Sequence, residues 1–427
     1  MILIKNGHVT DPKSGLDGKR DIILENDKIK TICQPGEWAE NMAEEDFEQV
    51  IDGEGMVVAP GLIDVHVHFR DPGLTYKEDI YTGAAAAARG GYTTVVCMAN
   101  TKPAVDNVET LKYVIEKGKE TGINVLAAAA ISVGLKGQEL TDMEELKKHG
   151  AAGFTDDGIP LMDEVLVQKA MEEAVRLDVP LSFHEEDPKF IKNNGISHGK
   201  VSDELGIFGS PAIAEDSLVA RDCMIALHTG ASVNIQHISS GNSVKMVALV
   251  KSLGAHVTAE VTPHHFTLDE EAVLKYGALA KMNPPLRTKT DREMLIQGLK
   301  DGTIDMIATD HAPHSTEEKS KPLTEAPSGI TGLETALSLG IMELVNKGHL
   351  TMMELIEKMS LNPAKLYRLD KGYLAEGKDA DIVMFAQKET WIVGDYCSKA
   401  ENSPFTGWEL SGKVKYTICG GKIAYQG

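Results

Sequence analysis

The chain has 427 residues, of which 42% are hydrophobic and 25% are charged, and this balance is typical of a globular protein with a large core. It contains 43 Lys and Arg residues against 64 Asp and Glu residues, so the formal net charge is −21. This acidic balance argues against a nucleic-acid partner, since phosphate backbones are bound by basic patches. No apolar stretch is long enough to cross a bilayer, so no membrane association is expected, and the N-terminal residues predict no signal peptide.

Short β-like runs with glycine turns lie near both ends of the chain. The first part of the sequence has them at 2–11 and 21–32, followed by an acidic stretch at 37–49 that predicts a solvated surface. Similar runs return at 379–385 and 415–425. The two ends of one chain with this pattern can build a small β domain together.

Between these flanks, strand-like and helix-like segments alternate with a period of about thirty residues. Strands that alternate with helices indicate a parallel sheet, and eight such units predict a (β/α)8 barrel. The expected strands are 61–69, 93–100, 123–131, 151–157, 180–186, 232–239, 256–265 and 304–311.

Two of the intervening helices carry start signals. Thr141 with Glu144 forms a possible capping box before a helical pattern that stops at Gly150. Thr290 with Glu293 repeats the signal later in the chain. We therefore expect helices to begin directly after Thr141 and Thr290.

The first barrel strand, "GLIDVHVHFRDPG" at 61–73, carries an unusual polar pattern. Because alternate side chains of a strand share a face, its polar residues should lie on one side and its apolar residues on the other. The polar face would hold Asp64, His66, His68 and Arg70, and the opposite face Val65, Val67 and Phe69. Buried polar groups of this kind must be paired or bound to a ligand.

Imidazole and carboxylate groups recur at the ends of the predicted strands. Active sites of (β/α)8 barrels form at the carboxyl ends of the strands, and these groups are the ligands that suit zinc and similar divalent metals. The candidate metal ligands are His66, His68, Asp157, His184, His237 and Asp310.

Six motifs together resemble the amidohydrolase superfamily, and most closely the longer-chain, class I type of bacterial dihydroorotases. They are "GLIDVHVHFRDPG", "FTDDG", "SFHEE", "IQHISS", "NPPLR" and "ATDHAPH". The resemblance extends over nearly the whole chain, including residues 362–385. It implies a TIM-type barrel of residues 60–367 beside a small β-sandwich domain built from residues 1–59 and 368–427.

The resemblance also implies two zinc ions. His66, His68 and Asp310 would bind one ion, His184 and His237 would bind the other, and Asp157 and a hydroxide would bridge them. Asp156 remains an alternative to Asp157. Hydantoinases and dihydropyrimidinases instead bridge their metals with a carboxylated lysine at the end of the fourth strand. The segment "AAGFTDDG" at 151–158 offers no lysine there.

The implied activity is the reversible cyclisation of N-carbamoyl-L-aspartate to L-dihydroorotate in de novo pyrimidine (UMP) biosynthesis. Zinc-bound water ionises near neutral pH, and the resulting hydroxide would attack the ring amide. Asp310 would take its proton and return it to the leaving nitrogen as general acid and base. The alternative role for Asp310 is that of a metal ligand only.

Substrate and product both carry a carboxylate, which a guanidinium matches with two parallel hydrogen bonds. Arg70 lies two residues beyond His68 on the same predicted face and is the expected anchor. Asn100 is one of the substrate-binding residues that the resemblance implies; the alternative is a turn residue, since asparagine favours turns. The resemblance adds further substrate-binding residues, the last three in a polar loop at 314–332: Asn100, Asn283, His314, Ser328 and Gly329.

Two other interpretations stay open. One is another cyclic amidase, such as a dihydropyrimidinase, hydantoinase or allantoinase, and the other is a catalytically silent partner of aspartate transcarbamoylase. The family suggests a homodimer, and an active enzyme can also associate with that transcarbamoylase. Five scattered cysteines without a C-x-x-C motif indicate free thiols and a cytoplasmic location.

Overall fold

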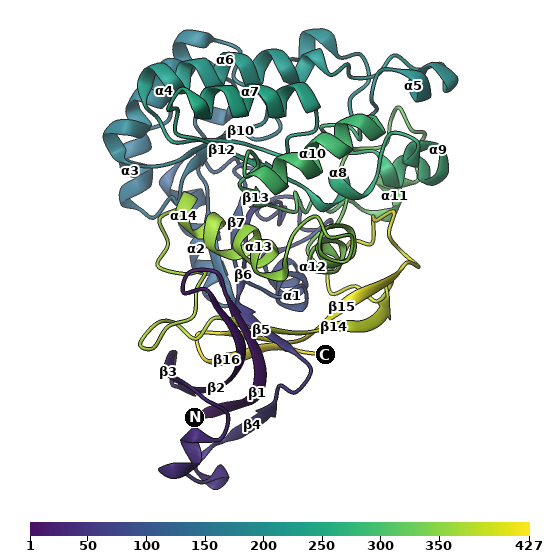
Figure 1. Cartoon of the computed structure of the whole chain (residues 1–427). Coiled ribbons are helices and arrows are strands. Elements are labelled where there is room, and N and C mark those ends of the chain that lie inside the picture. Colours follow the sequence, from purple (N-terminus) through teal and green to yellow (C-terminus); the bar gives the residue numbers. More distant parts are fainter.

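The computed structural model describes residues 1–427 and contains the predicted eight barrel strands in the predicted order (Figure 1). Each is shorter than its sequence pattern, because the last residues of every pattern belong to the segment that follows the strand. The strands are β6 (Leu62–Val67), β7 (Tyr92–Cys97), β8 (Asn124–Ala127), β9 (Phe154–Thr155), β10 (Leu181–Phe183), β11 (Val233–Ile235), β12 (Val257–Val261) and β13 (Met306–Ile307).

The barrel strands form two curved parallel sheets, and two isolated β-bridges join these sheets into a closed ring. One sheet is β6-β7-β8 and the other runs from β9 to β13. Ala129 bridges Phe154 at one joint, and Val67 bridges His311 at the other. The His68 N–H donates to the His311 carbonyl at 2.9 Å. The predicted (β/α)8 barrel is therefore confirmed.

Helices cover the outer surface of the barrel, and their apolar faces form one continuous core with the outward side chains of the strands. Short 3-10 turns and two π-helical turns, Ile341–Val345 and Glu357–Leu361, complete the connections. The helices are α1 (Ile80–Arg89), α2 (Val108–Gly118), α3 (Met143–Lys148), α4 (Glu164–Leu177), α5 (Lys200–Glu204), α6 (Ile213–Thr229), α7 (Gly241–Ser252), α8 (Pro263–Thr267), α9 (Ala272–Tyr276), α10 (Lys289–Asp301), α11 (Thr316–Lys319), α12 (Ala336–Gly340), α13 (Met352–Ile356) and α14 (Asn362–Leu366).

The two predicted helix starts were each misplaced by one or two residues. Helix α3 is capped by Asp142, because the Thr141 hydroxyl donates to the Ala130 carbonyl at 2.8 Å instead of capping the helix. Helix α10 begins two residues early, after Thr288, whose side chain forms a capping box with the first turn. Thr290 consequently lies inside this helix.

The expected alternation along the first barrel strand is interrupted near Val65. The Asp64 carboxylate accepts hydrogen bonds from the His66 N–H at 3.0 Å and from the Thr309 N–H at 3.1 Å. The register with β7 shifts between Asp64 and Val67. Val65 consequently packs in a different apolar cluster from Val67, although the sequence placed them on one face.

Strands from both chain ends form one sheet beside the barrel, in the order β16-β15-β14-β5-β1-β2-β3 with β4 paired to β1. Ile4 and Leu24 share a buried cluster with Ile382, Met384 and Ile418, so the predicted small β-sandwich domain from both ends is confirmed. In Figure 1 its purple and yellow strands lie side by side below the barrel. The exact division at 59/60 and 367/368 stays a prediction. The strands are β1 (Ile2–Asp11), β2 (Leu16–Glu25), β3 (Lys28–Cys33), β4 (Gln49–Asp52), β5 (Val57–Pro60), β14 (Ile382–Ile392), β15 (Glu409–Cys419) and β16 (Lys422–Gln426).

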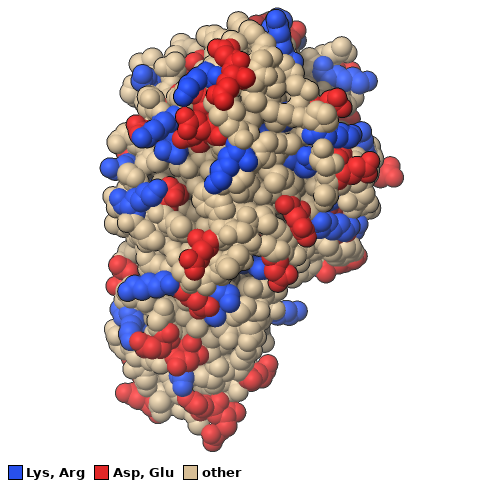
Figure 2. Space-filling model, turned by 90° about the vertical axis from the view of Figure 1, so that its right-hand side faces the viewer, with Lys and Arg blue, Asp and Glu red and all other residues tan.

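The surface agrees with the acidic composition. On the face drawn in Figure 2, acidic and basic side chains are interspersed, and they form no continuous basic patch there. No helix combines the length and the apolar character needed to cross a membrane.

Candidate metal centre and active site

The six candidate metal ligands meet at the carboxyl ends of the barrel strands. His66 lies in β6, His68 directly follows it, and the other four lie within three residues of the ends of β9, β10, β11 and β13. His66 is fully buried, and the other five line a polar cavity of about 390 Å³. The cavity therefore opens where barrel enzymes place their active sites.

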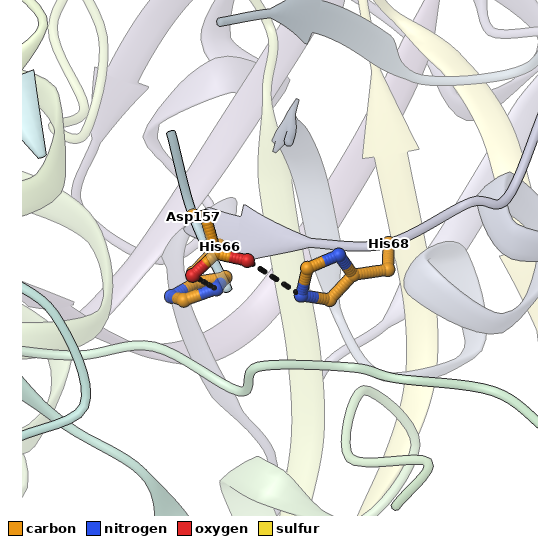
Figure 3. Close-up of side chains that lie close together, drawn as sticks. All are labelled: His66, His68 and Asp157. Carbon is orange, nitrogen blue, oxygen red and sulfur yellow. Dashed lines mark ion pairs between the residues drawn. The ribbon is translucent and has the colours of Figure 1, made fainter. Parts of the chain in front are cut away.

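His66, His68 and Asp157 form a first cluster (Figure 3). His66 Nε2 lies 3.3 Å from Asp157 Oδ1, and His68 Nε2 lies 3.4 Å from Asp157 Oδ2. One potential ligand atom from each residue lies within 4.8 Å of the others. All three side chains are buried, and His68 and Asp157 also line the cavity, so a metal held here would be open to substrate on one side.

A second cluster shares Asp157 with the first and adds His184 and His237. His184 Nδ1 lies 2.8 Å from His237 Nε2. The two nitrogens lie 3.8 Å and 3.7 Å from Asp157 Oδ1, respectively. One carboxylate thus stands between two pairs of imidazoles.

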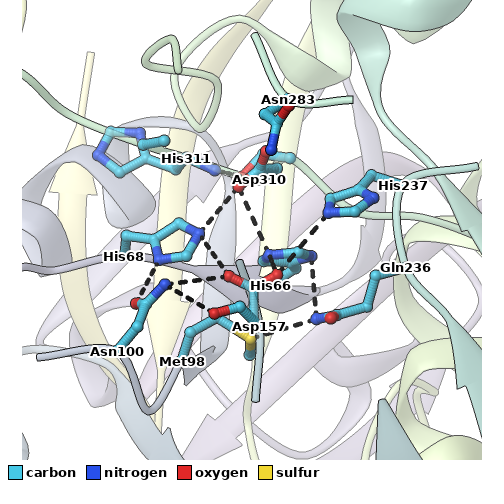
Figure 4. A network of polar contacts seen from close by, with 12 residues as sticks. His66, His68, Met98, Asn100, Asp157, Gln236, His237, Asn283, Asp310 and His311 are labelled. Carbon is cyan, nitrogen blue, oxygen red and sulfur yellow. Dashed lines mark hydrogen bonds and ion pairs between the residues drawn. The ribbon is translucent and has the colours of Figure 1, made fainter. Parts of the chain in front are cut away.

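Asp310 faces the first cluster from the opposite side (Figure 4). Its Oδ1 lies 2.9 Å from His68 Nε2 and 3.5 Å from His66 Nε2. It is 7% exposed and lines the cavity, so it is reachable from the substrate side.

The neighbouring Asp156 does not belong to this group. Its carboxylate accepts hydrogen bonds from the Ile131 N–H at 2.7 Å and the Ser132 N–H at 3.0 Å, and from the Ser132 hydroxyl. Of the two carboxylates that the sequence left open, only Asp157 faces the histidines.

The charges in the centre stabilise one another. Burial disfavours the charged form of His66, but Asp157, Glu260 and Asp310 outweigh it and raise the pKa of His66 well above its ordinary value. Burial likewise opposes ionisation of Asp157, yet His66 and His237 hold the pKa of Asp157 well below the usual range. The carboxylates therefore stay ionised at neutral pH and favour a cation.

Two buried atoms at the centre have no hydrogen-bond partner. They are His66 Nε2 and Asp157 Oδ1, which form an ion pair at 3.3 Å but no hydrogen bond with each other or with any other group. Unpaired buried polar atoms are rare in folded proteins and need an explanation such as an ion. Together with the clustered imidazoles, they make the centre compatible with metal binding.

Glu260, which the sequence analysis missed, orients His66. Its Oε1 lies 2.6 Å from His66 Nδ1, and its Oε2 accepts a hydrogen bond from the Asn234 amide at 2.9 Å. Such a carboxylate orients a histidine ring and holds a proton on Nδ1, so that Nε2 is the nitrogen that would lose its proton to bind a metal. The only signal in the sequence was an acidic residue within the apolar strand β12.

The residues expected to bind substrate also surround the cavity. Arg70 lines its wall, and the Arg70 Nε–H donates to the Pro313 carbonyl at 3.3 Å. Asn100 contacts His68 Nδ1 at 2.9 Å and donates to Asp157 Oδ2 at 3.2 Å. Asn283 Nδ2 lies 3.4 Å from His184 Nε2. Asn100 thus touches the centre itself.

The loop after β13 forms the opposite wall. His314 Nε2 lies 2.8 Å from the Ser328 carbonyl, and both residues line the cavity with Gly329. Burial, aided by Arg70 and nearby lysines, lowers the pKa of His314 to about 2, so its ring is neutral at pH 7. Gly329 has φ +131°, a conformation that side chains resist.

Two buried lysines that sequence reasoning missed hold this loop through backbone carbonyls. Lys281 Nζ donates to the carbonyls of Leu323 and Ala326 at 2.8 and 2.7 Å. Lys319 Nζ donates to the carbonyl of Gly329 at 3.0 Å, among others. Burial, followed by the charge of Lys281, lowers the pKa of Lys319 to about 7.

Three residues of the site have left-handed backbones. The φ angles are +58° at Arg70, +33° at His237 and +47° at Asp310. Non-glycine residues in this region store strain of about 1–3 kcal/mol each, and such strain is found at functional sites. In each case the chain turns sharply where it leaves a strand and presents its side chain to the cavity.

Comparison with known proteins agrees with this geometry. The model of the Amidohydrolase family matches residues 57–424. A dihydroorotase of Clostridioides difficile (strain 630) is 62% identical over 425 residues, and one of Clostridium acetobutylicum is 53% identical over 428; both alignments cover 100% of each chain.

Solved structures show the same fold. A D-hydantoinase (dihydropyrimidinase) from Thermus sp. superposes with a TM-score of 0.84 at 26% identity, covering 100% of this chain and 95% of that chain. An L-hydantoinase (dihydropyrimidinase) from Arthrobacter aurescens gives 0.87 at 22% identity, covering 99% and 95%. The full-length identity to the dihydroorotases is far higher than to either hydantoinase. The chain belongs to the amidohydrolase family and, within it, to the dihydroorotases.

Proposed function

We propose that this protein catalyses the reversible cyclisation of N-carbamoyl-L-aspartate to L-dihydroorotate in pyrimidine biosynthesis. The observation that carries the proposal is a pair of imidazole clusters sharing Asp157 at the floor of a polar cavity, with Arg70 in its wall. The full-length similarity to dihydroorotases supports it. A cavity of about 390 Å³ is large enough for a small cyclic substrate.

The donor set suits two zinc ions. His66, His68 and Asp310 would hold one, His184 and His237 would hold the other, and Asp157 would contact both. The unpaired His66 Nε2 and Asp157 Oδ1 support this assignment. When bound, zinc would lower the pKa of water and polarise the amide carbonyl.

Asp310 moves the proton in this scheme. In ring opening, its carboxylate takes a proton from the attacking water as the new C–O bond forms at the amide carbon. It then donates that proton to the ring nitrogen as the C–N bond breaks, which makes the nitrogen a viable leaving group. In ring closure the same carboxylate carries the proton in reverse.

The cavity walls hold the substrate. The Arg70 guanidinium would bind the substrate carboxylate through two parallel hydrogen bonds, with Asn100 and His314 beside it. Asn283 and the backbone of Ser328 and Gly329 would contact the ring. These groups fix which face of the amide meets the metals and Asp310.

A substrate panel with a metal count tests the proposal. Purified protein is assayed for ring opening of L-dihydroorotate, dihydrouracil and allantoin, while zinc per chain is measured on the same sample. Turnover of dihydroorotate alone is expected. Turnover of dihydrouracil would indicate a dihydropyrimidinase despite Asp157 in place of a lysine. With both metals bound, no turnover of any substrate would indicate a silent scaffold.

Replacing Arg70 by lysine is expected to raise KM for dihydroorotate about 10- to 100-fold, because the bidentate contact is lost. Steady-state kinetics checks this, with Arg176→Lys as the control, since Arg176 lies on the exposed surface of α4. A KM equal to that of the unchanged protein would place the carboxylate elsewhere in the cavity.

Glu260→Gln is expected to weaken zinc binding about 10- to 100-fold, because the amide no longer holds the His66 tautomer through a charge-assisted hydrogen bond. Zinc dissociation constants, measured by competition with a chelator, give the effect independently of turnover. Glu293→Gln, at an exposed position of α10, is the control. Unaltered zinc affinity in Glu260→Gln would contradict an orienting role.

The quaternary and cellular predictions are that the protein is a homodimer in the cytoplasm and that it can associate with aspartate transcarbamoylase. The five cysteines are all free, as a reducing compartment requires. Light scattering on the protein alone, and after mixing with that transcarbamoylase, tests both assemblies.

A further inference from the structure

A segment of the small β domain reaches the active-site face of the barrel. It is the connection 393–408 between β14 and β15. The Ser398 hydroxyl donates to buried Glu78, and the Cys397 N–H donates to Glu334 at 3.1 Å, so the segment is fixed against the barrel. Asn402, in the middle of this segment, is only 3% exposed.

The Asn402 side chain joins two stretches of the cavity wall. Its Nδ2 donates to the Ala312 carbonyl at 3.2 Å and to the Gly329 carbonyl at 3.0 Å. Its Oδ1 accepts a hydrogen bond from the His314 N–H at 3.0 Å. The Asn402 carbonyl accepts one from the Thr331 N–H at 3.1 Å. Both donor hydrogens of this amide are therefore used, one on each stretch.

The two stretches, 312–314 and 329–331, are 15 or more residues apart along the chain. The Ala312 N–H also donates to the Ile330 carbonyl at 2.8 Å, which pairs their backbones. That bond does not fix the His314 backbone, whereas Asn402 does. Together with the contact between His314 Nε2 and the Ser328 carbonyl, Asn402 thereby holds His314 close to Gly329, and both residues line the cavity.

We propose that Asn402 is a positioning residue for substrate, contributed to the barrel's active site by the small β domain. The inference rests on the proposed function for the identity of the substrate, but the contacts themselves do not depend on it. Because Asn402 contacts the walls and not the metal-ligand cluster, its removal should impair substrate binding more than the chemical step.

Asn402→Asp tests this with an isosteric change. The carboxylate keeps an acceptor for the His314 N–H but turns both donors into an acceptor that faces the carbonyls of Ala312 and Gly329. We expect KM for dihydroorotate to rise at least about tenfold, kcat to change less than about threefold, and zinc per chain to stay unchanged. The control is Glu401→Gln, an exposed neighbour whose side chain makes no hydrogen bond.

Hydrogen exchange provides a readout that needs no turnover. In Asn402→Ala the His314 N–H loses its acceptor, so peptides covering 312–316 and 327–331 should exchange at least about tenfold faster than in the unchanged protein. An unchanged KM in folded Asn402→Asp would overturn the proposal. So would a parallel loss of zinc, kcat and thermal stability, because that pattern marks a merely structural role.

Failure of the proposed function is recognised separately. If the unchanged protein does not turn over dihydroorotate, the proposed function fails, and hydrogen exchange alone decides the role of Asn402. Unchanged exchange at 312–316 and 327–331 would then refute the positioning role.

Discussion

Replacing Asp310 by asparagine is expected to lower kcat for dihydroorotate by about 10²–10⁴-fold, the usual contribution of a general acid and base. The asparagine oxygen can still face His68, but the amide cannot take up and return a proton. KM should change little, because Asp310 is not among the groups proposed to hold the carboxylate. Steady-state kinetics in both directions, with zinc counted on the same samples, measures the effect.

Asp142→Asn is the matched control for Asp310→Asn. It also removes one carboxylate, yet asparagine caps helix α3 as well as aspartate does. If Asp310→Asn keeps its full zinc content and a nearly unchanged kcat, Asp310 acts only as a metal ligand. If the variant loses one zinc together with kcat, the result does not distinguish metal binding by Asp310 from proton transfer by Asp310. The pH dependence of residual turnover in the zinc-reconstituted variant would then separate these two roles.

Asp157→Asn and Asp156→Asn are expected to differ sharply although the residues are adjacent. Asp157 stands between both histidine clusters, so its change should release at least one zinc per chain and lower kcat at least about 10²-fold. Asp156 accepts hydrogen bonds from the Ile131 and Ser132 N–H groups, which an asparagine oxygen can still accept. Its change should keep zinc and kcat and cost about 1 kcal/mol of stability.

Zinc analysis, kinetics and denaturant unfolding of the two variants check this comparison. Reversed results, with zinc lost in Asp156→Asn and kept in Asp157→Asn, would mean that the segment after β9 is shifted by one residue. Because successive side chains of an extended segment point to opposite sides, only one of Asp156 and Asp157 can face the histidines.

The barrel could be predicted because each strand leaves its own local pattern. Apolar runs with flanking turns recur along the chain, and all eight were found. Helix starts were harder, since Thr141 and Asp142 both offer capping oxygens and only the fold shows that Thr141 donates to Ala130 instead. Likewise, the alternation of side chains fails at Val65, where the register with β7 shifts. There the Asp64 carboxylate accepts hydrogen bonds from the His66 and Thr309 N–H groups, and no pattern of polarity in the sequence reveals such a contact.

The candidate site was predictable where function demands unusual residue types. Histidines on a buried strand have few structural explanations, so His66 and His68 were conspicuous. Glu260 could not be recognised, because its partner His66 lies 194 residues away along the chain. A single acidic residue in a strand does not indicate which residue it contacts. Asn402 is harder still, since it acts on backbone groups that every sequence has.

The left-handed backbones at Arg70, His237 and Asp310 limit how this scaffold can be redesigned for other substrates. β-branched residues tolerate that conformation poorly, so library positions 70, 237 and 310 should be restricted to asparagine, aspartate, glycine and the native residues. Grafting the side chains alone onto another barrel would leave them aimed wrongly, because the turn of the main chain aims them. The unit to transplant is a strand end together with its loop.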